Sequence, residues 1–378
     1  MEAAIVPLDA TTTEAAPLDV SWPLYSADDH LDMWALPHDV WTARLSRAHR
    51  DDGPRVVPRD GVLTWVVEDR AIGVSGRPTA GAQSALSRAG LDHDGLRPSD
   101  PAKRLADMER DGVWASVIYG PSVLRLPIED PELEAACLRA WNDWAAEFNS
   151  NAPDRLVALP VLPRHDPAEA AAELERVAAL GHRGALVYCF DIDCGDRAWD
   201  RLWAAAQEID LPLSFHIGGG VRFPVERGTW RTLAFSAVVA VQMVDPLVVM
   251  VMSGALERHP GLTVVLAEAG LGWVPYMVNR MDQASERWSM DLGVNAPQLR
   301  PSELFGRQVR VTFEEDPYGA QFVRMLPPGT CMWASDYPHA DSTFPRSRQA
   351  VAETLAGLDD STSRAVTAGT CRSLYGLA

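Results

Sequence analysis

Short apolar runs alternate with longer amphipathic segments over most of the chain. An early, weak run covers Leu24–Ala27, and helix-period segments such as Glu132–Asn149, Pro167–Leu180 and Arg197–Ile209 separate most of the later runs. These later runs are Trp114–Tyr119, Leu156–Leu162, Ala185–Phe190, Leu211–Phe215, Leu262–Ala267, Val309–Phe313 and Cys331–Ala334. Apolar strands separated by helices indicate parallel βα units whose strands are buried on both faces.

Eight strand candidates with intervening helices fit a closed (β/α)8 TIM barrel better than an open sheet. We therefore predict an α/β fold with one barrel domain over residues 21–378 and a flexible Ala-, Thr-, Glu- and Pro-rich tail over residues 1–20. A stretch from about 47 to 101, interrupted by Pro, Gly and Asp, distorts the barrel as an excursion after the first strand. An insertion of this length commonly shapes or covers a site, which makes it a lid candidate.

The charge balance and the apolar stretches narrow the choice of partners. The chain of 378 residues has a net charge of −18 and no basic run, which argues against nucleic acid or an anionic membrane as a partner. The stretch Ala234–Leu256 has the apolarity of a membrane span but carries Gln242 and an Asp245-Pro246 pair near its middle, which are costly in lipid. We expect a buried helix broken at Pro246 and no membrane anchor.

Cysteine and lysine usage excludes several chemistries. The five cysteines are widely spread and form no CxxC pair, so reduced thiols in a cytoplasmic enzyme are expected rather than disulfides or a cysteine zinc site. Lys103 is the only lysine among 34 basic residues, which makes Schiff-base chemistry improbable.

Ionisable residues follow several of the predicted strands. Active sites of βα barrels lie at the carboxyl ends of the strands, so these residues are expected to meet at one rim. The residues at these strand ends are Asp28, Asp29, His30, His216, Glu268, Glu314 and Asp336. The strand period of two places Asp28 and His30 on one face and turns Asp29 away.

Four of these residues form a candidate metal site. Asp28, His30, His216 and Asp336 are a mixed nitrogen and oxygen set that suits one divalent ion, Zn²⁺ or Mn²⁺, with a position left open for water or a small-molecule substrate. Each residue alone would pass for an ordinary cap or loop residue. Their order at the strand ends of one barrel favours the metal site.

These residues and several longer stretches resemble the amidohydrolase-2 branch of the metal-dependent amidohydrolase superfamily, which includes aminocarboxymuconate-semialdehyde, γ-resorcylate and 5-carboxyvanillate decarboxylases. The resemblance covers roughly residues 24–375. The stretches that carry it are Asp28-Asp29-His30, Asn142 with Pro153-Asp154-Arg155-Leu156, Phe215-His216-Ile217-Gly218, His259-Pro260-Gly261-Leu262, Glu268-Ala269-Gly270-Leu271-Gly272-Trp273-Val274-Pro275 and Ser335-Asp336-Tyr337-Pro338-His339.

The resemblance implies roles for the four candidate ligands. Asp28 and His30 stand where the family has HxH or ExH ligands, His216 matches the fifth-strand ligand, and Asp336 matches the eighth-strand aspartate that binds metal and handles protons. An acidic residue at position 28 makes the site harder and favours Mn²⁺ or Zn²⁺. Some members bridge two metals with a carboxylated lysine, but the predicted fourth strand has none, so a single metal is expected. The resemblance also implies a homodimer or homotetramer.

The implied reaction is the nonoxidative decarboxylation of an aromatic or unsaturated carboxylic acid, with Asp336 as the proton donor. One departure keeps an alternative open, because Glu268 stands where the family's decarboxylases have a catalytic histidine. A metal-dependent hydrolase or hydratase of an amide, lactone or C–C bond would use Glu268 and Asp336 as acid and base. Two further alternatives are a barrel that binds a small molecule without turnover and a structural pairing of Glu268 with an arginine such as Arg280.

Other polar and aromatic residues are weaker candidates around this site. His339 follows Asp336 by three residues and either assists catalysis through a hydrogen bond to a metal ligand or caps the following loop. For substrate binding, Arg222 is a candidate partner of a carboxylate, Trp34 of an aromatic face, and Glu314 of the pocket wall. A surface arginine and a packed tryptophan are the plain alternatives for the first two.

Overall fold

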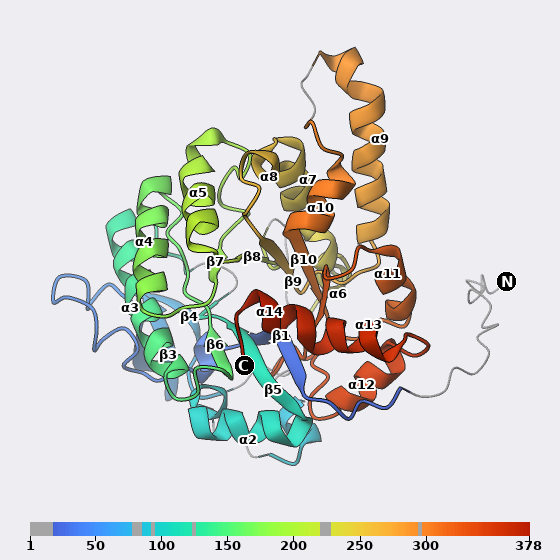
Figure 1. The fold of residues 1–378 in the computed structure, drawn as a ribbon. Coiled ribbons are helices and arrows are strands. Elements are labelled where there is room, and N and C mark those ends of the chain that lie inside the picture. The colour runs from blue at the N-terminus through green and yellow to red at the C-terminus, as the bar shows by residue number, and fades with distance from the viewer. Residues whose placement is uncertain (1–17, 78–84, 92–94, 123–125, 220–227, 294–296) are drawn as a thin grey trace.

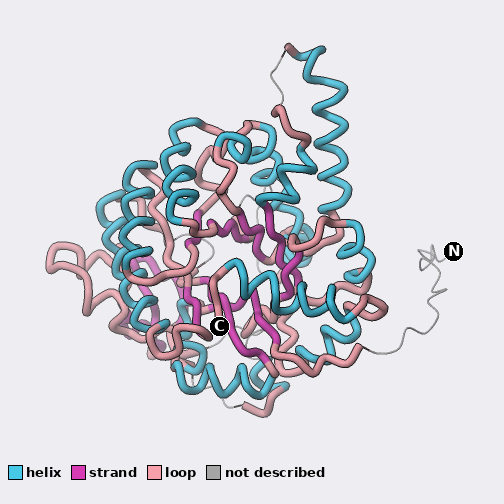
Figure 2. Tube along the Cα trace, viewed as in Figure 1, coloured by secondary structure: helices cyan, strands magenta, loops and turns pink. Residues whose placement is uncertain are grey.

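The computed structural model describes residues 18–77, 85–91, 95–122, 126–219, 228–293 and 297–378. Most of the tail predicted for residues 1–20 lies outside these ranges. Within them, eight parallel strands follow one another around the centre of the molecule (Figures 1 and 2). They are β1 (Leu24–His30), β5 (Val113–Tyr119), β6 (Leu156–Ala158), β7 (Ala185–Val187), β8 (Leu213–His216), β9 (Val264–Ala267), β10 (Val309–Phe313) and β11 (Cys331–Trp333).

Backbone hydrogen bonds close these strands into a barrel. Continuous ladders join β1-β5-β6 and β7-β8-β9-β10-β11. Leu186 of β7 donates to Pro160 O at 2.8 Å, which joins β7 to the segment after β6. On the other side, Asp336 N donates to Asp28 O at 2.8 Å and His30 N to Tyr337 O at 2.7 Å, which joins the end of β11 to β1. The predicted TIM barrel is therefore confirmed.

Helices surround this barrel (Figure 1). Three of them, α2 (Pro101–Asp111), α3 (Pro131–Asn149) and α4 (Pro167–Ala179), begin at an Asp-Pro pair whose aspartate accepts backbone N–H bonds of the first turn. Further helices are α5 (Asp200–Ile209), α6 (Trp230–Val238), α7 (Val244–Met252), α8 (Ala255–Arg258), α9 (Val274–Leu292), α10 (Pro301–Gln308), α11 (Gly319–Met325), α12 (Ser347–Thr354), α13 (Asp360–Arg364) and α14 (Thr370–Leu374). Short 3-10 helices are η1 (Met33–Ala35), η2 (Arg97–Ser99), η3 (Arg197–Trp199) and η4 (Ala240–Met243), and η5 (Ala365–Gly369) is a π-helix.

The excursion after β1 contains a small antiparallel sheet of β2 (Arg55–Arg59), β3 (Val62–Val67) and β4 (Arg70–Val74). Trp65 of β3 is fully buried, and its ring lies 5.3 Å from that of Trp41, in the segment that follows β1. This contact anchors the sheet to the barrel. A covering role of residues 47–101 over the site stays a prediction.

The apolar stretch 234–256 differs from the expected buried helix. It is divided among α6, η4, α7 and α8, and the bend of 44° lies between α6 and η4 rather than at Pro246, which occupies the first turn of α7. α7 is largely packed into the body, whereas α6 has no buried residue. Among the described helices none is by itself long and apolar enough to cross a membrane, although the bent pair Trp230–Val238 and Ala240–Met252 together meets those criteria of length and composition.

A buried carboxyl joins two helices of the outer layer and makes stability depend on pH. Asp111, at the end of α2, accepts from Ser347 N at 2.9 Å and from Ser347 Oγ at 2.5 Å at the start of α12. Burial raises the pKa of Asp111 from 3.8 to about 6.

The folded chain therefore holds this proton more tightly than the unfolded chain, and the stability contributed by Asp111 falls as pH rises through 6. Asp111→Asn keeps an acceptor without the charge. Between pH 5 and 7.5 the wild type should lose about 1 kcal/mol of unfolding free energy relative to this variant, as measured by urea denaturation. Parallel pH profiles for the two proteins would contradict this assignment.

Candidate metal centre

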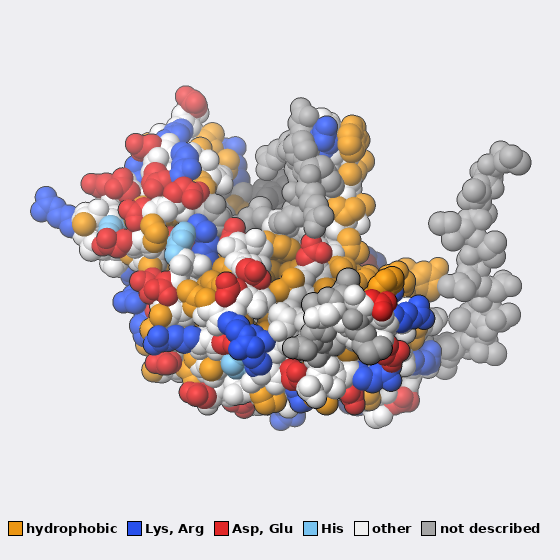
Figure 3. Space-filling model, turned by 90° about the horizontal axis from the view of Figure 1, so that it is seen from above, with side chains coloured by type: hydrophobic (Ala, Val, Ile, Leu, Met, Phe, Trp, Pro, Cys, Tyr) orange, Lys and Arg blue, Asp and Glu red, His pale blue; other side chains and the backbone are white. Residues whose placement is uncertain are grey.

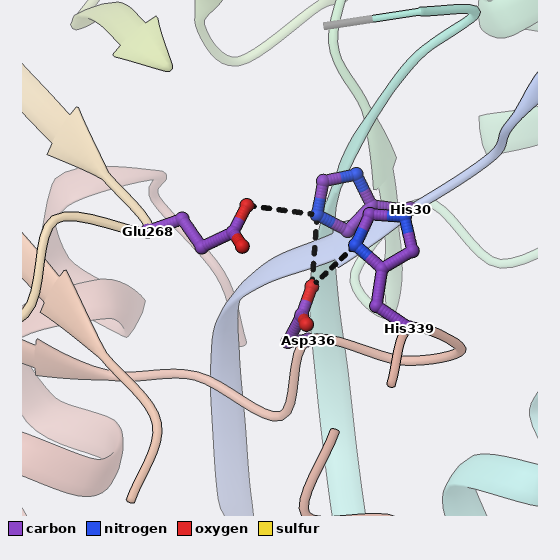
Figure 4. A group of neighbouring side chains, drawn as sticks. All are labelled: His30, Glu268, Asp336 and His339. Atoms are coloured by element: carbon purple, nitrogen blue, oxygen red, sulfur yellow. Dashed lines mark ion pairs between the residues drawn. The ribbon is translucent and has the colours of Figure 1, made fainter. Parts of the chain in front are cut away.

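The polar strand ends meet at the mouth of the barrel. Asp28 and His30 come from β1, and His216 comes from β8. Glu268 is the first residue after β9, and Asp336 lies in the loop that follows β11. Figure 4 shows Glu268, His30, Asp336 and His339 turned toward one another. Asp28, His30, His216 and Asp336 are buried, so the expected convergence is present in the structure.

The donor atoms form two groups that meet at His30: one holds Asp28, His30 and His216, and the other holds His30, Glu268, Asp336 and His339. His30 Nε2 is 3.0 Å from Asp336 Oδ1 and 3.4 Å from Asp28 Oδ1. His216 Nε2 is 3.5 Å from the same Asp28 oxygen. Glu268 Oε2 adds a third carboxylate, 3.4 Å from His216 Nε2 and 3.9 Å from His30 Nε2. Imidazole nitrogens and carboxylate oxygens that crowd together in this way are typical of a cation site.

Hydrogen bonding leaves these atoms available for an ion. Among the described residues, Asp28 Oδ1, His30 Nε2, His216 Nε2 and both carboxylate oxygens of Asp336 are buried without a hydrogen-bond partner. His216 Nδ1 lies 2.9 Å from Ile217 O, a carbonyl that can only accept, so the proton sits on Nδ1 and the Nε2 lone pair faces the cluster. Since unpaired buried polar atoms are costly, two imidazoles and two carboxylates in this arrangement fit one divalent ion of the Zn²⁺ or Mn²⁺ type.

A carboxylate–imidazole–carboxylate chain leads away from this cluster. His339 Nδ1 lies 3.0 Å from Asp336 Oδ1, and His339 Nε2 lies 3.1 Å from Asp32 Oδ2. The His339 ring also stacks on His30, with centroids 3.8 Å apart. Burial lowers the pKa of His339, but Asp336 and Asp32 raise it well above its usual value. His339 therefore contacts the carboxylate of Asp336, a candidate metal ligand, and whether this contact assists catalysis stays a prediction.

The carboxyl groups around the cluster differ in acidity. Burial, reinforced by the charge of Asp336, raises the pKa values of Asp28 and Glu268 well above the usual range. Burial also tends to raise the pKa of Asp336, but His339 and His30 outweigh this effect and hold the pKa of that carboxyl below its usual value. The same balance, with His339 as the dominant cation, lowers the pKa of Asp32 to about 2. Carboxyl groups with divergent acidity are typical of acid–base sites.

Two site residues adopt an unfavourable backbone conformation. Glu268 has φ 53° and Asp336 φ 56°, in the left-handed region where side chains other than glycine are strained. Glu268 N donates to Thr312 Oγ1 at 2.7 Å, and the same hydroxyl donates to Asp28 Oδ2 at 3.3 Å. Thr312 of β10 thus links the Glu268 backbone to a candidate ligand.

The weaker candidates have different surroundings. Glu314 follows β10 with one buried oxygen that lacks a hydrogen-bond partner, and burial together with the charge of Asp336 raises its pKa. Trp34 packs with Leu86 and Phe344 in a small apolar cluster and donates its indole N–H to Asp32, so its link to the site runs through Asp32. Arg222 lies outside the described residues.

Three residues near the site were not predicted from the sequence: Asp32, Thr312 and Tyr119. Asp32 continues the two-residue spacing of Asp28 and His30, a signal that would have identified it. Tyr119 ends β5; its ring lies 4.8 Å from that of His216, and its hydroxyl donates to Ser214 at 3.0 Å. These contacts position the His216 ring at the barrel mouth. Among the described residues, the ion pairs of Glu268 are with His30 and His216.

Solved structures show the same fold. An amidohydrolase from Mycobacterium avium subsp. paratuberculosis K-10 has a TM-score of 0.77 and 21% identity over 94% of this chain and 100% of its own. A dihydroxybenzoic acid decarboxylase from Polaromonas sp. JS666, solved with bound manganese and the inhibitor 2-nitroresorcinol, has a TM-score of 0.63 and 16% identity over 94% of this chain and 97% of its own.

Sequence comparison places the chain in a family. The γ-resorcylate decarboxylase of Rhizobium radiobacter is 30% identical over 211 residues, which cover 51% of this chain and 61% of that enzyme. The match thus spans about three fifths of the relative's length. The family model described as amidohydrolase matches residues 47–377, most of the chain and most of the site. The chain therefore belongs to the amidohydrolase family.

Proposed function

We propose that this chain is a mononuclear metal-dependent decarboxylase that removes CO2 nonoxidatively from an aromatic or unsaturated carboxylic acid. The observation that carries the proposal is the convergence of unpaired donor atoms from Asp28, His30, His216 and Asp336, linked to one another by distances of 3.0–3.5 Å at the barrel mouth. The names of the relative from Rhizobium radiobacter and of the Polaromonas structure support this reaction class.

One divalent ion, manganese or zinc, is the proposed cofactor. The manganese in the Polaromonas structure supports this choice, as does the mixed nitrogen and oxygen donor set of this chain. Asp28, His30, His216 and Asp336 would hold the ion. When bound, it supplies positive charge that orients a substrate carboxylate and neighbouring oxygen and stabilises negative charge in the transition state.

The surrounding side chains account for the proton that decarboxylation consumes. His339, whose pKa is raised despite burial by Asp336 and Asp32, would pass its proton to the Asp336 carboxylate, which lies 3.0 Å away. Asp336 would transfer that proton to the substrate carbon that bears the carboxylate, and the bond to that carboxylate then breaks to release CO2. His339, 3.0 Å from Asp336 and about a quarter exposed, can return a proton from water. Glu314 would accept a hydrogen bond from a substrate hydroxyl, and Arg222 would pair with a carboxylate. The Trp34 ring is packed against Leu86 and Phe344, so it would act on the site only through its bond to Asp32.

Glu268 favours a second candidate function. Its carboxylate lies beside both histidines and is 19% exposed, so it can reach a molecule in the site. In a metal-dependent hydrolase or hydratase of an amide, lactone or C–C bond, Glu268 or Asp336 would take a proton from the attacking water and return it to the leaving group.

We also propose a homodimer or homotetramer in the cytoplasm. On α6, Trp230 is 67% and Leu233 75% exposed, and large apolar side chains exposed together commonly mark an interface. Figure 3 shows hydrophobic side chains, in orange, along one of the projections that extend toward the top of the view. Five free cysteines, all buried, suit a reducing compartment.

His216→Ala should abolish tight metal binding, because it removes the Nε2 lone pair, one of the proposed donors to the ion. Metal analysis of dialysed protein and competition with a chromophoric chelator should show Mn²⁺ or Zn²⁺ affinity reduced more than about 100-fold. His182→Ala is the matched control, since His182 is equally buried but bonds to Asn142 O. Wild-type metal affinity in His216→Ala would refute the site.

Glu268→Gln should retain the metal and lose turnover by about 100-fold or more, because the amide cannot transfer a proton. Headspace CO2 from a panel of hydroxybenzoates measures decarboxylation, and ¹⁸O incorporation from water into cyclic acyl compounds measures hydrolysis. The exposed Glu315→Gln provides the control. Full activity of Glu268→Gln would remove this carboxyl from the mechanism, and ¹⁸O incorporation without CO2 would replace decarboxylation by hydrolysis.

Light scattering after size exclusion should give the mass of two or four chains. Leu233→Glu should reduce that mass, because it places a charge on the exposed face of α6, whereas Leu180→Glu, at an exposed position after α4, should not. A monomeric wild type at micromolar concentration would contradict the proposed assembly.

A further inference from the structure

The loop that carries Asp336 is attached to β1 by three consecutive backbone N–H groups. Ser335 N donates to Ser26 Oγ at 2.8 Å, Asp336 N to Asp28 O at 2.8 Å, and Tyr337 N to Asp29 Oδ1 at 3.1 Å. Two of the three acceptors are side chains, so this junction of the barrel depends on particular residues rather than on a regular ladder. The three N–H groups belong to Asp336, which has the left-handed backbone conformation, and to the residues directly before and after it.

β1 has an irregularity where it supplies these acceptors. Ser26 pairs with Ser116 of β5 and Asp29 with Ile118, so three steps along β1 correspond to two along β5. This shift corresponds to a β-bulge, a feature that redirects side chains beside active sites. Ser26 Oγ donates to Asp29 Oδ1 at 2.8 Å, which binds the two acceptors to each other across the bulge.

A buried cation holds Asp29 from outside the barrel. Arg104 of α2 is fully buried; its Nη2 donates to Asp29 Oδ2 at 3.2 Å, and its Nη1 donates to His30 O at 2.9 Å. Ser116 Oγ also donates to Asp29 Oδ2. A buried carboxylate is tolerated when it is paired and hydrogen-bonded in this way. Asp29 therefore has four donors and faces away from the metal cluster, as the strand spacing predicts.

We propose that Ser26 and Asp29, with Arg104 behind them, are positioning residues that fix the Asp336 carboxylate against the metal-facing side chains of β1. β1 then positions all three of these candidate ligands. It carries Asp28 and His30 itself, and it holds Asp336 through the amides of residues 335–337. Left-handed backbone at Asp336 is unfavourable and persists only where surrounding contacts impose it. The inference rests on the metal site of the proposed function.

Ser26→Ala and Asp29→Asn test this role without touching a proposed ligand. Ser26→Ala removes the acceptor of Ser335 N, and Asp29→Asn replaces the charged partner of Arg104. In metal-free protein, deuterium exchange of a peptide covering residues 335–340 should accelerate in both variants. Competition with a chelator should show Mn²⁺ or Zn²⁺ affinity reduced by about 10- to 100-fold, the usual effect of residues that orient metal ligands.

Ser347→Ala is the matched control. It also removes a fully buried serine hydroxyl that donates to an aspartate, Asp111, but it retains the three amide bonds around Asp336. Its exchange over 335–340 and its metal affinity should remain within two-fold of the wild type.

The outcomes separate this role from the proposed function. Unchanged exchange in Ser26→Ala and Asp29→Asn, or faster exchange with unchanged metal affinity, would overturn the positioning role. A wild type that binds neither Mn²⁺ nor Zn²⁺ would instead reject the metal site itself, whereas a metal-binding wild type that releases no CO2 would reject only the reaction.

Discussion

The buried polar cluster at the barrel mouth is the constraint on which the rest of the site depends. Two imidazole nitrogens and three carboxylate oxygens, from Asp28, His30, His216 and Asp336, are removed from water there without hydrogen-bond partners. Like charges in such a place repel, which is why burial and Asp336 raise the pKa values of Asp28 and Glu268. A divalent cation resolves both problems at once, since it pairs the orphaned atoms and neutralises their charge.

Hydrogen bonds from residues that surround the cluster hold this unfavourable arrangement in place. Ile217 O fixes the His216 tautomer, Thr312 links the Glu268 backbone to Asp28, and Asp32 holds His339 against Asp336. The Thr312 bond supports the strained backbone of Glu268, and the bonds from residues 335–337 to β1 support that of Asp336. The folded barrel thus keeps these carboxylate and imidazole groups close together, although the carboxylates repel one another.

The sequence predicted the barrel and the metal cluster better than their surroundings. Strand-length apolar runs mark all eight barrel strands to within a few residues, and the Asp166-Pro167 pair begins α4 as expected. Thr312 was not predicted because a hydroxyl inside a strand acquires a role only through neighbours distant in sequence, whereas the two-residue spacing of Asp32 from His30 was a local signal that the sequence did offer. α6 is exposed where a buried helix was expected, because an apolar run shows that a surface avoids water but not what covers it.

Anomalous diffraction from crystals grown with manganese, and separately with zinc, tests the central claim most directly. The account predicts one strong peak per chain at the metal's absorption edge, with Asp28, His30, His216 and Asp336 all within bonding distance, about 2.0–2.2 Å for zinc. An empty barrel mouth in both crystals, a second ion there, or a peak bound by other residues would contradict it.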